Sequence, residues 1–216
     1  EFLKNPPEVI LLDDAFQHRK VKGGLNILLT SYSNLYVNDF MLPTGNLREN
    51  KKGARRAEII IVTKCPSDLS EKEQKKIIKK LRPTIYQNVF FTYIEYDTIL
   101  KGDNSINISE LNNKEVILVT GIANSTPLVK HLHNEGVIFK HLEYGDHHNF
   151  TDKDLEKIKT IQSNNKVVLT TEKDYVRIFD KLKKLYYLPI ETKFINRKSD
   201  FDNIIKKYVE QSSRNS

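Results

Sequence analysis

Two adjacent carboxylates near the start of the chain are its first candidates for chemistry. Asp13 and Asp14 follow the apolar run Val-Ile-Leu-Leu at residues 9–12, which predicts a buried strand that ends in two acids. At the carboxyl end of a strand in an open α/β sheet, such oxygens lie where ligands bind, and they suit Mg²⁺ in the manner of a Walker B pattern. Acids at strand ends also cap turns and helices, so the pattern alone leaves both interpretations open.

Three polar side chains come shortly after the acid pair. Gln17, His18 and Arg19 contribute an amide, an imidazole and a guanidinium, all of which can donate hydrogen bonds to phosphate or sugar oxygens. The grouping favours a phosphate site. A histidine without a function on the surface is the competing interpretation.

A second candidate segment is the turn-rich loop at residues 42–49, where a proline and a glycine direct the backbone. It ends in Arg48 and Glu49, which could neutralise phosphate charge and add a metal ligand. An exposed loop with an ordinary ion pair is the alternative. The basic run at residues 51–56 either meets an anionic surface or forms a solvated helix face.

The tripeptide Asp146-His147-His148 is the third candidate. A histidine beside a carboxylate is held in one tautomer and made more basic, which suits proton abstraction from a hydroxyl or metal ligation. Adjacent residues point in different directions, so we expect one of the two histidines to face a site. Lys64, and the Thr-Glu-Lys-Asp segment at residues 171–174, are weaker candidates for nucleotide contact, because helix capping explains much of the latter.

Short β-branched runs that alternate with amphipathic stretches must position these side chains. This alternation predicts an α/β fold with a mostly parallel sheet. We expect strands at residues 9–12, 25–29, 59–63, 89–96, 116–120, 137–142, 166–170 and 185–190. Helices are predicted to begin at Ser70, Thr126 and Thr151, and a last helix to cover residues 200–209.

Length and composition narrow the class of protein. The chain has 216 residues, a net charge of +7 and one cysteine, Cys65, which cannot form an internal disulfide. No apolar run approaches the roughly 18 residues that a membrane span needs. The positive charge favours an anionic partner, although lysines scattered over helices are equally typical of a solvated surface. The chain begins Glu1-Phe2-Leu3 without an initiator methionine, so we expect that an upstream portion exists.

Five motifs in order resemble the tetraacyldisaccharide 4'-kinases of lipid A biosynthesis. They are Leu-Leu-Asp-Asp-Ala-Phe-Gln-His-Arg at 11–19, Leu-Pro-Thr-Gly-Asn-Leu-Arg-Glu at 42–49, Thr-Gly-Ile-Ala-Asn at 120–124, Gly-Asp-His-His at 145–148 and Thr-Glu-Lys-Asp at 171–174. The resemblance implies a kinase that transfers the γ-phosphate of ATP to the 4'-hydroxyl of a tetraacylated glucosamine disaccharide 1-phosphate, giving lipid IV A. It also implies peripheral contact with an anionic membrane at the cytoplasmic face of the Gram-negative inner membrane. We expect a monomer, and we expect no nucleic-acid partner, because the nearest cluster of basic and aromatic residues, at residues 183–187, is better explained as a strand entering the core.

The same resemblance assigns roles by position. It implies ATP and Mg²⁺ as cofactors, with Asp13, Asp14 and Glu49 near the metal and Asp13, Asp14, Arg48 and Lys64 near the nucleotide. His147 matches the histidine that partners the family's catalytic aspartate, and Asp14, Gln17, His18 and Arg48 complete the expected catalytic set. Position 15 is Ala where many members have Gly, a change that we expect to be tolerated.

The resemblance also implies a P-loop nucleotide-binding lobe and a smaller C-terminal α/β lobe, with the active site between them. We assign residues 1–64 to the C-terminal part of the first lobe, 65–212 to the second, and 213–216 to a disordered tail. The family's Gly-rich loop and its catalytic aspartate belong upstream of the acid pair, and no Gly-x-x-x-x-Gly-Lys-[Ser/Thr] occurs in this sequence. We therefore expect negligible kinase activity from this chain alone.

Two other functions remain open at this stage. Asp146-His147-His148 resembles the DHH phosphoesterases in that tripeptide only, and with Asp13 and Asp14 it could form a two-metal hydrolytic site. A basic α/β module that binds a nucleotide or another anion without chemistry is the non-enzymatic alternative.

Overall fold

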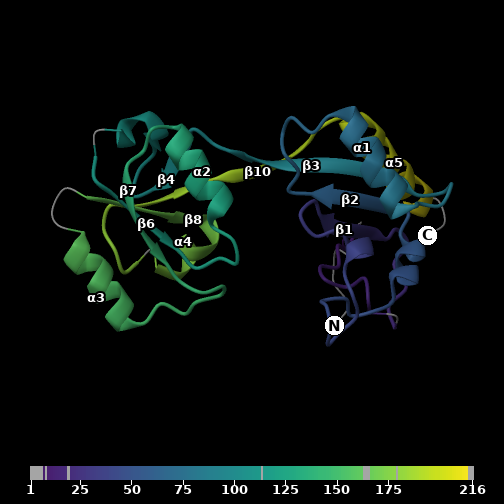
Figure 1. Ribbon diagram of the computed structural model, residues 1–216, viewed down its shortest axis with the longest axis horizontal. Helices are drawn as coiled ribbons and strands as arrows, with labels where there is room; N and C mark the ends of the chain where they lie inside the picture. Colours follow the sequence, from purple (N-terminus) through teal and green to yellow (C-terminus); the bar gives the residue numbers. More distant parts are fainter. Residues whose placement is uncertain are drawn as a thin grey trace. The chain divides into compact units, whose positions relative to one another are not determined.

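The computed structural model describes residues 7, 9–18, 20–112, 114–162, 166–178 and 180–213. The chain divides into two compact units, of which the first comprises residues 1–94 and 192–216 and the second residues 95–191. Each unit has its own sheet (Figure 1) and its own core of buried apolar side chains. The predicted α/β class, with mostly parallel strands, is confirmed in both.

The first unit is built on a four-stranded sheet in the order β1-β2-β3-β10, in which the pairs β1–β2 and β2–β3 are parallel. Its strands are β1 (Ile27–Ser31), β2 (Ile59–Thr63), β3 (Asn88–Tyr96) and β10 (Ile190–Phe194). Its helices are α1 (Glu71–Leu81), α5 (Lys198–Ser213) and the short 3-10 turns η1 (Tyr36–Asn38) and η2 (Lys51–Arg56).

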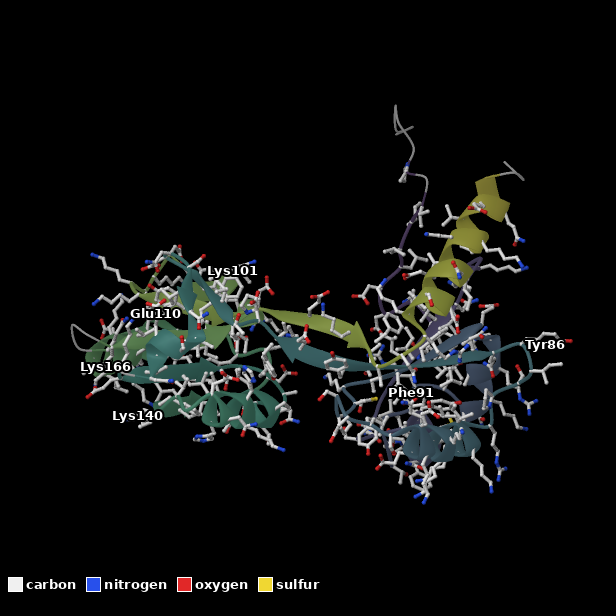
Figure 2. The ribbon with its side chains drawn as sticks, turned by 90° about the horizontal axis from the view of Figure 1, so that it is seen from above. Tyr86, Phe91, Lys101, Glu110, Lys140 and Lys166 are labelled. Carbon is white, nitrogen blue, oxygen red and sulfur yellow. The ribbon has the colours of Figure 1, made fainter. Side chains whose placement is uncertain are left out.

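Strand β2 forms the centre of the first core because successive side chains point to opposite faces of the sheet. Ile60 and Val62 pack in the cluster that includes the apolar face of α1, while Ile59 and Ile61 pack in the cluster that includes α5. Figure 2 shows these two helices, α1 in blue and α5 in yellow, on opposite sides of the strands. The unit is therefore a sheet covered by a helix on each face.

Helix α1 begins where the sequence predicts. The Ser70 hydroxyl accepts the Glu73 amide and the Glu73 carboxylate accepts the Ser70 amide, which is the capping box expected from their spacing. The helix ends at Leu81, and the next residue, Arg82, adopts a left-handed conformation directly before Pro83. Local sequence signals alone are sufficient to set these two ends.

The second unit is built on a six-stranded sheet in the order β5-β4-β9-β8-β6-β7. Its strands are β4 (Ile99–Gly102), β5 (Ile106–Asn107), β6 (Val116–Thr120), β7 (Phe139–Glu143), β8 (Val167–Thr171) and β9 (Leu185–Leu188). Its helices are α2 (Thr126–Asn134), α3 (Asp152–Ile161), α4 (Glu172–Ile178) and the 3-10 turn η3 (Ile108–Leu111). The strands β9, β8, β6 and β7 are parallel to one another. Strand β4 runs antiparallel to both of its neighbours, β9 and β5.

Strand β6 is central to this sheet, and all five of its residues are buried. Leu118 packs in one cluster with Leu128 of α2, whereas Ile117 packs in another with Ile158 of α3 and Ile178 of α4. The second unit is thus a three-layer sandwich whose carboxyl strand ends carry three of the five family-like motifs.

The strand predicted at residues 9–12 is wrong. Val9, Ile10, Leu11 and Leu12 are 46%, 71%, 91% and 56% exposed, and they form no strand in the described structure. An apolar run becomes a strand only where a neighbouring strand binds its backbone N–H and C=O groups, and both described sheets are composed of other segments. Asp13 and Asp14 consequently lie in a turn and not at the end of a buried strand.

Other boundaries also differ from the sequence predictions. The strand expected over residues 185–190 is interrupted at Pro189, which cannot donate a backbone hydrogen bond, so that β9 and β10 belong to different sheets. The antiparallel strands β4 and β5 were not predicted. Cys65 is buried in the core of the first unit, so the lobe boundary predicted between residues 64 and 65 does not coincide with a boundary between these units.

The predicted disordered tail at residues 213–216 falls almost wholly outside the described residues, since α5 ends at residue 213. Arg19 also lies outside them. Within the described part of the chain, no helix has the length and apolar character needed to cross a bilayer.

Candidate functional site

In the first unit, an ion pair joins two of the segments that the sequence analysis singled out. The Arg48 guanidinium donates to the Asp14 carboxylate at 2.9 Å, although 34 residues separate them in the chain. Both side chains are largely exposed, so the pair is accessible to a ligand and is screened by solvent. The backbone of Asp14 is in the left-handed region, with a φ of 48°, and its amide donates to the carboxylate of Asp13.

Arg56 fixes the same two segments more firmly. Its guanidinium donates to both carboxylate oxygens of Glu49, at 3.1 and 2.7 Å, and to the carbonyl oxygen of Phe16 at 2.9 Å. It also lies over the Phe16 ring, 4.7 Å from the centroid. The hydrogen bonds to Glu49 raise the pKa of Arg56. A Cβ at Gly53 would lie 2.6 Å from the Glu49 carboxyl carbon, so glycine leaves room for this clamp.

The loop that carries Arg48 is held by an internal carboxylate. Asp39 accepts hydrogen bonds from the Phe40 amide at 2.7 Å and the Asn46 amide at 3.2 Å. These two bonds lower the pKa of Asp39. The Leu42–Pro43 peptide bond within the loop is cis. The path of the loop therefore depends on its own turn chemistry, as its proline and glycine indicate.

The other residues predicted to lie near the nucleotide have fewer contacts with the Asp14–Arg48 pair. Gln17 is half-buried and His18 is exposed, both directly after the Asp14 turn. Lys64 is exposed after the last residue of β2, with a φ of 56°, at the carboxyl edge of the sheet. In the part of the chain that the structure describes, Lys64 forms no ion pair with Asp14.

The predicted metal ligands are only partly compatible with a magnesium site. Among the described residues, no three His, Cys, Asp or Glu side chains form a cluster that could hold a metal ion. Glu49 is engaged by Arg56 and Asp14 by Arg48. Magnesium that arrives with nucleotide phosphates needs only one or two protein carboxylates, and the adjacent Asp13 and Asp14 supply oxygens of that kind. The place of Glu49 as a third ligand stays a prediction.

In the second unit, the two adjacent histidines lie in different surroundings. The His148 ring stacks on Tyr144 with centroids 4.7 Å apart, and its Nε2 lies 3.0 Å from the Asp154 carboxylate. The side chain of His147 is 70% exposed and its backbone is left-handed, with a φ of 57°. His148 is thus part of the local packing, while His147 presents its imidazole to solvent or to a ligand.

The carboxylate partner of His148 makes the stability of the second unit sensitive to acid. Hydrogen bonds from Thr151 and from His148 lower the pKa of Asp154 to about 2, from an ordinary value of 3.8. A carboxylate whose pKa is lower in the folded than in the unfolded protein stabilises the fold at pH values above its unfolded pKa. This stabilisation is lost as the pH falls from about 4 towards 2.

We expect the free energy of unfolding of Asp154→Asn to fall less than that of wild type between pH 5 and 2, as measured by urea unfolding. Asp152→Asn, an exposed acid in the same helical turn, should retain the wild-type pH dependence; equal slopes for Asp154→Asn and wild type would contradict the assignment.

His147 is part of a small polar cluster. The Lys173 ammonium lies 3.3 Å from His147 Nε2 and 3.3 Å from Asp146 Oδ1. Desolvation raises the pKa of Asp146, but the bond from Lys173 and the charges of His147 and Lys173 outweigh it, so the pKa is lowered overall. Lys173 lies in the segment that the sequence made a weaker candidate for nucleotide contact, and Arg56 in the basic run at residues 51–56, but neither residue was given a role of its own. Only the folded chain shows which partners they contact.

Comparison with known proteins identifies the family of the chain. The family model described as Tetraacyldisaccharide-1-P 4'-kinase (LpxK) matches residues 2–210. A relative from Flavobacterium johnsoniae, named tetraacyldisaccharide 4'-kinase, is 50% identical over 209 residues, which is 95% of this chain and 61% of the relative. A relative of the same name from Flavobacterium psychrophilum is 49% identical over 220 residues, which is 99% of this chain and 63% of the relative.

The fold is also similar to a solved structure, described as the "apo" form of LpxK from Aquifex aeolicus in complex with ATP. The two share 26% sequence identity with a TM-score of 0.64, and the match covers 91% of this chain and 56% of that one. The chain therefore spans less than two thirds of the length of each of these relatives. The extent of the family match, over nearly all of its residues, shows that the chain belongs to the tetraacyldisaccharide-1-P 4'-kinase family.

Proposed function

We propose that this chain forms part of a tetraacyldisaccharide 4'-kinase, which transfers the γ-phosphate of ATP to the 4'-hydroxyl of tetraacyldisaccharide 1-phosphate to give lipid IV A. The observation that carries this proposal is the family match over residues 2–210. The contact between Asp14 and Arg48 supports it, because it joins two of the family-like motifs in space. The ATP complex of the Aquifex aeolicus relative supports ATP as the phosphate donor.

In the first unit, the proposed task is to hold the nucleotide. Phosphoryl transfer depends on positioning and on neutralising charge at the phosphate oxygens. Arg48 and Lys64 supply positive charge for that purpose, and Gln17 and His18 supply hydrogen-bond donors. Asp13 and Asp14, with Glu49 as the further candidate, would hold Mg²⁺, which when bound neutralises phosphate charge.

In the second unit, the proposed task is to prepare the acceptor. His147 is exposed, and its Nε2 lies within 3.3 Å of Lys173 and 3.7 Å of an Asp146 oxygen. Together with the catalytic aspartate that the family resemblance places upstream, a neutral imidazole can take the proton of the attacking sugar hydroxyl. The hydroxyl oxygen bonds to phosphorus as the bond from phosphorus to the oxygen of the leaving ADP breaks. We assign this role to His147 and not to His148, because the ring of His148 is packed against Tyr144.

We further propose that the protein works as a monomer at the cytoplasmic face of the Gram-negative inner membrane, in peripheral contact with anionic lipid. Its acceptor would be a lipid with a charged sugar head, and a net charge of +7 favours approach to an anionic surface. Nothing in the comparisons supports the two alternative functions, a phosphoesterase or a non-catalytic anion-binding module.

The test uses a chimera in which the N-terminal part of the Flavobacterium johnsoniae kinase, where the family resemblance places the Gly-rich loop, precedes this chain. We expect the chimera to transfer radiolabelled phosphate from ATP to tetraacyldisaccharide 1-phosphate, and this chain alone to transfer none above background. A chimera that folds and binds ATP but does not phosphorylate the lipid would overturn the proposed function. Strong transfer by this chain alone would overturn the expectation that the upstream loop is needed.

A further inference from the structure

The carboxylate of Asp174 is fully buried at the start of α4. Its Oδ2 accepts hydrogen bonds from the Gly121 amide and from the Thr171 hydroxyl, each at 2.8 Å. Among the residues that the structure describes, its Oδ1 has no hydrogen-bond partner, and the Arg177 guanidinium lies 3.6 Å away. Burial of a charged group is costly unless it is compensated, so this arrangement calls for an explanation.

Helix capping explains only part of the arrangement. The same Thr-x-x-Asp spacing begins α3, where Asp154 accepts from the amide and hydroxyl of Thr151 at the protein surface. At α4, the acid accepts from the Thr171 hydroxyl and from the amide of Gly121, which follows a different strand, β6. The hydrogen bond from Gly121, after β6, to Asp174, after β8, is therefore not part of the helix cap.

Gly121 connects Asp174 to the candidate catalytic histidine. Its amide donates to Asp174, and its carbonyl oxygen accepts the amide of His147 at 3.2 Å. The same His147 amide also donates to Asp146 Oδ1 at 3.0 Å, so Gly121 and Asp146 share it. His147 has a left-handed backbone, which is uncommon for a residue other than glycine and persists only where the surroundings hold it. A Cβ at Gly121 would lie 3.1 Å from Asp174 Oδ1, so glycine permits this close approach.

The first turns of α4 also contact the histidine segment through side chains. Lys173 reaches the His147 imidazole and Asp146, and the Arg177 guanidinium donates to the carbonyl oxygen of His148 at 3.4 Å. These contacts lie at the carboxyl ends of β6 and β8, which are neighbours in the sheet. From β6 the chain continues through α2 to β7 on one side, and from β8 it continues to β9 on the other. Open α/β sheets bind ligands at such a point of divergence.

We propose that Asp174 is a positioning residue for His147, acting through Gly121, and that Lys173 from the same turn holds the imidazole itself. Asp174 sets the backbone from which the imidazole projects, and Lys173 restricts the ring. The catalytic consequence rests on the proposed kinase function, whereas the structural consequence does not.

The structural part is tested on this chain by NMR. Asp174→Asn keeps the size of the side chain and removes its charge. We expect it to shift the Gly121 and His147 amide signals and to speed the hydrogen exchange of both at least tenfold. Lys173→Gln should change the imidazole nitrogen signals of His147 and leave the Gly121 amide as in wild type. Glu172→Gln, which removes a charge from an exposed residue of the same turn, should change neither.

A folded Asp174→Asn protein in which the Gly121 and His147 amides exchange at wild-type rates would overturn the proposal. If Asp174→Asn fails to fold, Gly121→Ala tests the same link, because the added methyl crowds the carboxylate while its charge remains. Unchanged His147 signals in a folded Gly121→Ala protein would likewise overturn it. Unchanged imidazole signals in Lys173→Gln would overturn the part assigned to Lys173.

The catalytic part is tested in the chimeric kinase. Displacement of a reacting group by about 1 Å costs on the order of a hundredfold in rate, so we expect Asp174→Asn to lower kcat by about tenfold to a hundredfold with the KM for ATP unchanged. An inactive wild-type chimera would count against the kinase function and leave the NMR result standing. An active chimera in which Asp174→Asn retains the wild-type kcat would count against the positioning role alone.

Discussion

Replacement of His147 by alanine is expected to lower the kcat of the chimeric kinase by about 10²- to 10⁴-fold, the usual contribution of a general base. The side chain is 70% exposed and its contacts are with Lys173 and Asp146, so its removal should leave the fold intact. Steady-state kinetics at saturating ATP and lipid measure the effect. The thermal midpoint of the variant should remain close to that of wild type.

The matched control for this experiment is Asn149→Ala, an exposed polar residue two positions further along the same segment. We expect it to keep the wild-type kcat. A His147→Ala chimera with a kcat within threefold of wild type would show that another group accepts the proton. A loss that appeared only as a higher KM would instead indicate that His147 binds the acceptor.

Replacement of Phe90 by alanine is expected to destabilise the first unit by about 3–5 kcal/mol, the range for a large aromatic side chain lost from a core. Phe90 is 1% exposed and packs edge-to-face against Phe194 and Phe201, with ring centroids 6.0 and 5.5 Å away. The change therefore leaves a cavity between β3 and α5. Hydrogen exchange at the amides of β2 reports the free energy of opening this unit.

Phe40→Ala is the matched control, because Phe40 belongs to the same unit and is 64% exposed. The Lys51 ammonium lies over the Phe40 ring, 5.3 Å from its centroid. A cation–π contact of this kind stabilises an exposed site by about 0.5–1 kcal/mol. We expect Phe40→Ala to lower the free energy of unfolding by an amount within that range. Similar losses for Phe40→Ala and Phe90→Ala would show that α5 does not contribute a core to this unit.

Much of the local structure could be predicted from the sequence. The bounds of β2 and β6 agree with the predicted strands, and the capping boxes at Ser70 and Thr151 mark the starts of α1 and α3. These features depend on residues within a few positions of one another. Hydrogen-bonding side chains and apolar spacing act over one or two helical turns, so a single stretch of sequence contains all the information needed.

The apolar run at residues 9–12 shows where such prediction fails. Its composition is that of a buried strand, yet its residues are exposed, because a strand is defined by its partners and not by its own side chains. The antiparallel strands β4 and β5 were missed for a related reason. They are short, and they exist through pairing with each other and with β9.

The candidate site, too, could be predicted from the sequence only in part. From sequence alone, the residue types indicated a phosphate site, the resemblance of five ordered motifs implied a kinase, and the two together named Asp14, Arg48 and His147. Only the tertiary structure decided that Arg48 pairs with Asp14, that His147 and not His148 is exposed, and that Asp174 is joined to His147 through Gly121. The physical reason is that these contacts link segments 26 to 53 residues apart, and only the pairing of strands and the packing of helices bring such segments within hydrogen-bonding distance.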